Sequence, residues 1–210
     1  MQELRLPYFS IDGYFGGSQS WMLDPQMRLG GCAALTACDL CIQLSLFHGD
    51  TMLFPFSGQS LDKSLYRKFS AVMKPYLHPR ITGVDTLKLF LDGFGRYLQT
   101  IPNQPLRLSP FYGDKPAQEA KEAVLERLKD GFPLPCLVLN HKDKGFSDFV
   151  WHWFLLVGCR EEQGRFQVLA ATYGEGVWLD FLRLWDTGFQ RKGGLILVDS
   201  LLEKSKTFHF

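Results

Sequence analysis

The chain has 210 residues, 46% of them hydrophobic, and 23 Lys and Arg residues nearly balance 22 Asp and Glu residues to leave a formal net charge of +1. This composition supports a buried core, which excludes a disordered or fibrous protein, and the balanced charge without a basic cluster argues against nucleic acid as a partner. Because no N-terminal signal pattern and no apolar run of about 18 residues is present, we expect a cytoplasmic protein without a membrane span.

Residues 1–31 are expected to form an irregular lead-in that is rich in Gly, Ser and aromatic residues. A helix is predicted from Cys32 to Phe47, directly after the pair Gly30-Gly31. Its apolar residues occupy almost every face of the helix, which is typical of a helix in a protein interior. Gly49 is expected to end it in a left-handed conformation.

Three further helices are predicted in the middle of the chain, at 60–73, 84–97 and 116–129. Short runs rich in β-branched and aromatic residues then predict strands at 134–139, 149–159, 165–171, 176–179 and 194–198, with a short helix at 180–185. The expected fold class is α+β in one domain over residues 1–210. It comprises a lead-in and a buried helix (1–50), a helical section (51–131) and an antiparallel sheet (132–210) on which the buried helix packs.

The chain contains an odd number of cysteines in mostly apolar surroundings: Cys32, Cys38, Cys41, Cys136 and Cys159. This pattern favours free thiols in a reducing compartment over a disulfide framework. Cys38 and Cys41 form a C-x-x-C in mid-helix, where core packing is the expected role, so we predict no metal and no cofactor. A zinc or thiol site on this pair is the weaker alternative, and it predicts stoichiometric zinc in the purified protein.

Cys32 has the position of a catalytic nucleophile, because the N-terminus of a helix presents unpaired N–H groups and the positive end of the helix dipole. We therefore expect its pKa to lie below the value of about 8.5 for a free thiol. His152 interrupts an apolar strand, and a buried histidine requires partners for its nitrogens. The pair predicts an imidazole base delivered from the sheet to a thiol at the head of the helix.

The remaining histidines are poorer candidates for the base. His48 ends the same helix as Cys32, and the rise of 1.5 Å per residue places it about 24 Å away. Three others are expected at the surface: His78, His141 and His209.

A hairpin centred near residue 162 would place Thr172 opposite His152, where its hydroxyl could orient the imidazole. A backbone carbonyl near Ala171 or Tyr173 is the alternative partner. An oxyanion hole would combine the N–H of Cys32 with a glutamine side chain, for which Gln26 and Gln19 are both candidates.

A glutamine six positions ahead of a Gly-Cys that begins an apolar helix resembles the papain-like cysteine peptidases. The runs 152–158 and 168–174 are similar to the bacteriocin-processing, double-glycine-leader peptidases and their bacterial relatives. The resemblance covers about the first fifty and the last sixty residues, and it implies a papain-like fold with Cys32 as nucleophile, His152 as base and Gln26 or Gln19 in the oxyanion hole. The family usually has Asp or Asn at the position of Thr172, and commonly Gly at that of Ala33.

The expected function is that of a cysteine-dependent acyl-transfer enzyme, a peptidase or amidohydrolase acting on a peptide or another amide-containing substrate. An acyltransferase or transglutaminase-type enzyme with the same Cys-His pair is one alternative. A non-catalytic binding module that keeps the fold is the other, and the uncharged Thr172 favours it. Aromatic residues between 54 and 112 are expected to line the substrate groove, and the sequence does not indicate an oligomeric state.

Overall fold

The structure is a computed structural model that describes residues 3–80, 83–103 and 106–201. It is a mixed α+β fold built on a seven-stranded sheet whose strand pairings are antiparallel. The strands follow the order β4-β9-β5-β6-β7-β8, and β1 pairs with the far end of β6. Their bounds are β1 (Leu4–Arg5), β4 (Leu106–Tyr112), β5 (Leu134–Val138), β6 (His152–Glu162), β7 (Arg165–Thr172), β8 (Glu175–Asp180) and β9 (Gly194–Ser200). A separate hairpin joins β2 (Ser10–Ile11) to β3 (Tyr14–Phe15).

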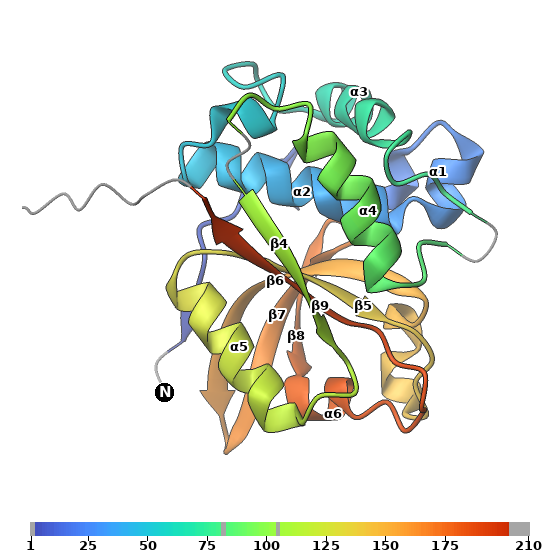
Figure 1. The fold of residues 1–210 in the computed structure, drawn as a ribbon, viewed down its shortest axis with the longest axis vertical. Helices are drawn as coiled ribbons and strands as arrows, with labels where there is room; N and C mark the ends of the chain where they lie inside the picture. Colours follow the sequence, from blue (N-terminus) through green and yellow to red (C-terminus); the bar gives the residue numbers. More distant parts are fainter. Residues whose placement is uncertain (1–2, 81–82, 104–105, 202–210) are drawn as a thin grey trace, which may run out of the picture.

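The helices gather in two groups at opposite ends of the molecule (Figure 1). The upper group consists of α1 (Pro25–Gly30), α2 (Cys32–Phe47), α3 (Lys63–Met73) and α4 (Leu87–Leu98). The lower group consists of α5 (Ala117–Lys129) and α6 (Phe181–Trp185). Three short stretches of 3-10 helix lie between these elements: η1 (Gln19–Trp21), η2 (Thr51–Leu53) and η3 (Lys144–Phe149).

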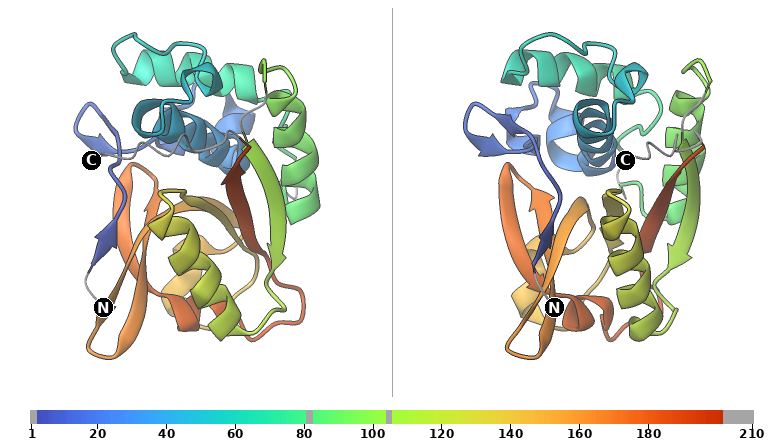
Figure 2. Two further views of the ribbon diagram at one scale, coloured as in Figure 1. Left: turned by 60° about the vertical axis from the view of Figure 1, so that its left-hand side comes forward. Right: turned by 90° about the vertical axis from the view of Figure 1, so that its left-hand side faces the viewer.

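The sheet separates two apolar cores. One contains almost the whole of α2 together with residues of α3, α4 and β6, and the other contains residues of α5, α6 and the opposite face of the sheet. Trp153, Leu155 and Val157 of β6 belong to the first core, whereas Phe154 and Leu156 belong to the second. This alternation follows from the two-residue period of a strand, and it confirms that the helix beginning at Cys32 packs on the sheet. Figure 2 shows α2 lying across the end of the strands.

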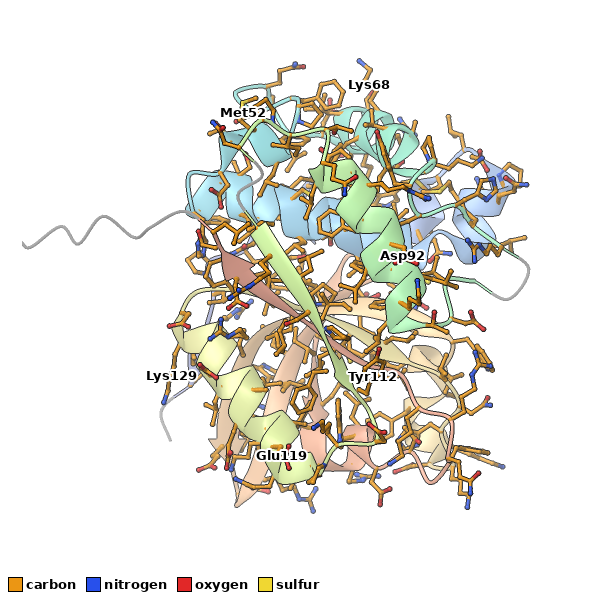
Figure 3. All side chains as sticks on the ribbon, viewed as in Figure 1. Met52, Lys68, Asp92, Tyr112, Glu119 and Lys129 are labelled. Carbon is orange, nitrogen blue, oxygen red and sulfur yellow. The ribbon has the colours of Figure 1, made fainter. Side chains whose placement is uncertain are left out.

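The other helices of the middle section are amphipathic. In α4, Phe90 and Phe94 are fully buried while Asp92 is exposed, and in α5 Val124 is buried while Glu119 is exposed. Figure 3 shows Asp92 and Glu119 on the outer sides of their helices. These helices therefore cover the cores with one face, as their periodicity predicts.

Most predicted elements are confirmed, but two parts of the prediction are wrong. Residues 51–131 are not wholly helical, because Leu106–Tyr112 forms the edge strand β4 against β9. Pro110 lies within it, and an edge strand tolerates proline because one side needs no ladder hydrogen bond. The lead-in also contains a helix, α1, which Asp24 caps by accepting the N–H groups of Gln26 and Met27.

The hairpin of β6 and β7 has a different register from the predicted one. Leu155 lies opposite Ala171, and the register shifts between Leu156 and Gly158. The prediction that His152 lies directly opposite Thr172 is therefore wrong. The two residues lie diagonally on the same face of the sheet, where long side chains still meet.

Among the described residues, none of the helices combines the length and hydropathy that a bilayer crossing requires.

Candidate active site

Cys32 is the first residue of α2, and Gly31 precedes it as the N-cap without a side-chain capping bond. The backbone N–H groups of Trp153, Ala33 and Cys32 itself lie close enough to the sulfur to favour the thiolate and lower its pKa. Two of these donors belong to the start of the helix, where N–H groups have no partner within the helix. The third belongs to β6, so the thiol lies where the helix meets the strand.

The predicted low pKa of Cys32 is wrong. Burial raises the pKa of the thiol above its ordinary value, and the three N–H groups lower it by less. Only 8% of Cys32 is exposed, and a thiolate loses its hydration at such a position. The helix terminus therefore reduces the cost of ionisation without making Cys32 an acidic thiol.

His152 is the first residue of β6 and is buried. A hydrogen bond of 2.7 Å joins its Nε2 to the hydroxyl of Thr172, so the structure contains the predicted contact despite the different register. The ring also stacks on Tyr173, with centroids 4.5 Å apart. Burial lowers the pKa of His152 to about 4, so the imidazole is neutral at pH 7.

The helix and the strand bring Cys32 and His152 to one place. One of the N–H groups that lower the pKa of Cys32 belongs to Trp153, the residue that follows His152. Both side chains line a small cavity of about 20 Å³, the space of roughly one water molecule, and both line a wider groove of about 1410 Å³. The side chains of a candidate nucleophile and a candidate base thus share a site that opens into the groove.

The two candidate glutamines occupy different positions. Gln19 lines both the small cavity and the groove, and its Nε2 donates a hydrogen bond of 2.8 Å to the carbonyl of Arg28. Gln26 is exposed on α1 and lines the groove but not the small cavity. Gln19 is therefore the glutamine that shares the inner cavity with Cys32.

Two strained residues flank the histidine and its partner. Trp151 precedes His152 with φ +52°, and Tyr173 follows Thr172 with φ +54°. Each left-handed residue costs roughly 1–2 kcal/mol, which the surrounding contacts must offset. For Trp151 these contacts include its backbone N–H on the carbonyl of Leu139 and its indole N–H on the side chain of Asn140. Both strained residues line the groove.

A buried carboxylate that was not predicted from the sequence shares the small cavity with Cys32. Asp39 lies seven positions further along α2, on the same helix face, and lines the small cavity. Its carboxylate accepts hydrogen bonds from the hydroxyls of Tyr66 (2.7 Å) and Tyr8 (2.9 Å) and from the N–H of Gly17 (3.2 Å). Burial raises its pKa to about 6, against these hydrogen bonds. Asp39 thereby ties the loop that leads to Gln19 onto α2, and a lone acid in an apolar helix was the signal for it.

The groove is not lined by the aromatic residues expected from the sequence. Phe54, Phe94 and Tyr97 belong to the core, and none of the residues between 54 and 112 that were expected there lines the groove. Its apolar wall consists instead of residues such as Leu29, Trp151 and Tyr173. The prediction failed because amphipathic helices turn their aromatic faces towards the interior.

None of the other described histidines lines the small cavity or the groove. His48 is exposed and His141 is partly buried, and their Nε2 atoms form hydrogen bonds with the carbonyls of Gly131 and Arg183 respectively. His78 is exposed as well, and His209 lies outside the described residues. Cys38 and Cys41 are buried in the core around α2.

Comparisons of the chain with protein families, with curated proteins and with solved structures gave no match.

Proposed function

We propose that this protein is a cysteine-dependent acyl-transfer enzyme, a peptidase or amidohydrolase, in which Cys32 is the nucleophile and His152 the base. One observation carries the proposal: Cys32 and His152 line the same small cavity and the same wider groove. A papain-like fold is part of the proposal. Its support is a helix that begins at the cysteine and packs on an antiparallel sheet whose strand β6 begins at the histidine.

The resting pair is neutral. Burial lowers the pKa of His152 to about 4 and raises that of Cys32, so at pH 7 the proton stays on the sulfur. When Nε2 donates its proton to Thr172, the lone pair on Nδ1 is available to accept the thiol proton. Proton transfer then accompanies attack on the substrate, as general-base catalysis, and does not precede it.

The chemistry follows from these roles. Cys32 forms a bond to the acyl carbon of the amide, and the imidazolium of His152 gives its proton to the departing amine as the C–N bond breaks. Water or an amine acceptor then attacks the thioester and releases Cys32, with His152 accepting the proton of the attacking group. The Cys32 N–H and the Gln19 amide are the proposed donors to the oxyanion.

A non-catalytic binding module is the second candidate. The observation that favours it is the neutral pair itself, because Thr172 carries no charge to stabilise an imidazolium. In that case the groove would hold a ligand, and Cys32 would be a buried thiol like the other four.

Competition among the five thiols for iodoacetamide at pH 7 separates the two candidates. Burial raises the pKa of Cys136 well above its ordinary value and that of Cys159 to about 11. Both residues, like Cys38 and Cys41, are less exposed than Cys32. An enzyme should be alkylated first at Cys32, and His152→Ala should slow that reaction at least about tenfold. His48→Ala is the matched control, because His48 is exposed and distant from the site.

Mass spectrometry of digested protein would locate the label. Equal, slow alkylation of all five cysteines, or a Cys32 rate that is the same with and without His152, would contradict the enzyme and favour the binding module.

A further inference from the structure

The groove beside Cys32 carries positive charge. Arg28 and Arg80 both line it together with Cys32 and His152, and none of the described residues that line it is an aspartate or glutamate. The whole chain is nearly neutral, so this is a local concentration of one sign of charge. A cleft with such walls attracts anions and holds them near its nucleophile.

Arg28 is positioned by the loop that also holds Gln19. Its Nε donates a hydrogen bond of 3.0 Å to the carbonyl of Met22, and its own carbonyl accepts the Gln19 amide. The residue is nevertheless exposed, so solvent and ligands reach its side chain. Arg28 therefore presents a fixed guanidinium four positions before Cys32.

Arg80 lines the same groove as Arg28 and Cys32. A Cβ built on Gly30 would lie 3.4 Å from the Arg80 carbonyl, so the chain at Arg80 packs against the segment that leads into Cys32. Neither Arg28 nor Arg80 forms an ion pair with another described residue, whereas Arg191, which lies over Trp151, is paired with Asp85. The two groove arginines are thus available to a ligand.

The same groove offers apolar surface. Leu29, Trp151 and Tyr173 line it and are 86%, 45% and 47% exposed. We infer that the substrate acylating Cys32 is an acidic peptide or amide, with a carboxylate near the scissile bond that Arg28 and Arg80 bind and an apolar group that lies on these three residues. The guanidinium fork matches a carboxylate geometrically. The inference rests on the proposed function, because it names the substrate of that site.

Two alkylating reagents of similar size test the charge directly. Iodoacetate is anionic and iodoacetamide is neutral, and both react with the same thiolate, so the ratio of their rates at Cys32 does not depend on its pKa. We expect this ratio to exceed that of 2-mercaptoethanol, a neutral free thiol, at least about fivefold at low salt. The excess should disappear between about 0.01 M and about 1 M salt, where the Debye length falls from about 30 Å to about 3 Å.

Charge reversal assigns the effect to its residues. Arg28→Glu and Arg80→Glu should each lower the iodoacetate to iodoacetamide ratio about three- to tenfold. Arg165→Glu is the matched control. Arg165 is exposed and lies opposite Glu162 in the register of β6 and β7. Glu162 is the last residue of β6, about 33 Å along the strand from His152.

Substrate preference gives the second measurement. Digestion of a peptide mixture in which each member occurs with Glu and with Gln beside the cut should favour the Glu peptides, and Arg28→Glu should reverse the preference.

The failures are distinguishable. If Cys32 is alkylated first by iodoacetamide but shows the iodoacetate ratio of a free thiol, the acidic substrate is refuted and the enzyme is not. If neither reagent alkylates Cys32 faster than the other cysteines, both the proposed function and this inference are refuted. Equal ratios in the three arginine variants would likewise overturn the inference.

Discussion

Replacing Asp39 with asparagine should change how the stability of the protein depends on pH. The pKa of Asp39 is about 6 in the folded chain against an ordinary value of 3.8, because burial outweighs its three hydrogen bonds. A raised carboxyl pKa means that the folded state keeps its proton where the unfolded state has lost it. The stabilisation is therefore complete below pH 3.8 and is lost as the pH rises through about 6.

The magnitude follows from the two pKa values. Each tenfold difference in proton affinity is worth about 1.4 kcal/mol, so the interval from 3.8 to about 6 corresponds to about 3 kcal/mol. Asparagine has no such titration. Relative to the native chain, Asp39→Asn should gain about 3 kcal/mol in free energy of unfolding between pH 3.8 and pH 7. Any cost of presenting an amide to Tyr8, Tyr66 and Gly17 does not change with pH.

His152 acts in the opposite direction. Its pKa falls from 6.5 to about 4 on folding, so its contribution is present above pH 6.5 and is lost as the pH falls towards 4. In the native chain the two titrations nearly cancel over this range. Asp39→Asn should therefore expose the His152 effect as a fall in stability on acidification.

Urea unfolding followed by tryptophan fluorescence at a series of pH values measures these differences. Asp24→Asn is the control: the side-chain hydrogen bond with Lys74 lowers the pKa of Asp24 below its ordinary value of 3.8, so the difference between this variant and the native chain should stay constant from pH 4 to pH 7. A difference between Asp39→Asn and the native chain that stays constant from pH 4 to pH 7 would refute the reasoning.

Two further substitutions test the surroundings of the site. Gly17→Ala would place its Cβ 1.9 Å from the Tyr66 hydroxyl, so the free energy of unfolding in urea should fall by roughly 1–3 kcal/mol. Gly95→Ala is the control: no atom lies within 4 Å of its Cβ, and it should stabilise α4 by roughly 0.5–1 kcal/mol. Equal changes in stability for Gly17→Ala and Gly95→Ala would contradict the close packing of Gly17 on Tyr66. Thr172→Val should leave the buried Nε2 of His152 without its partner, which should lower the free energy of unfolding by about 1–3 kcal/mol and slow alkylation of Cys32. Thr172→Ser should retain both the stability and the alkylation rate of the native chain. A valine variant as reactive as the serine variant would show that the hydroxyl does not orient the ring.

The reactivity of the neutral pair, Cys32 and His152, should depend on the ligand that occupies the groove. Cys32 and His152 carry no charge at neutral pH, and Arg28 and Arg80, which line the same groove, form no ion pair with another described residue. An anionic substrate that excludes water from this groove would strengthen every electrostatic interaction within it. The acidic-substrate inference and the general-base role of His152 thus depend on the same desolvated geometry.

Local patterns in the sequence determined most of the secondary structure. The bounds of α2, Cys32 and Phe47, are those predicted, because the glycines before it and the unbroken apolar run within it act over neighbouring residues. The histidine in an apolar strand likewise identified His152 as a buried group that needs a partner. The edge strand β4 escaped prediction, because its pairing with β9 depends on residues far along the chain and not on its own short, proline-containing run.

Only the tertiary structure decided the properties of the site. The pKa of Cys32 depends on how far its surroundings, including Trp153, remove the sulfur from water, and no pattern around residue 32 reports that burial. The choice of Gln19 as the glutamine in the inner cavity depends on a loop tied to Asp39, and the diagonal contact of His152 with Thr172 depends on the register of β6 and β7. Helix and strand formation are governed by near neighbours, whereas desolvation and cross-strand contacts join residues that are distant in sequence.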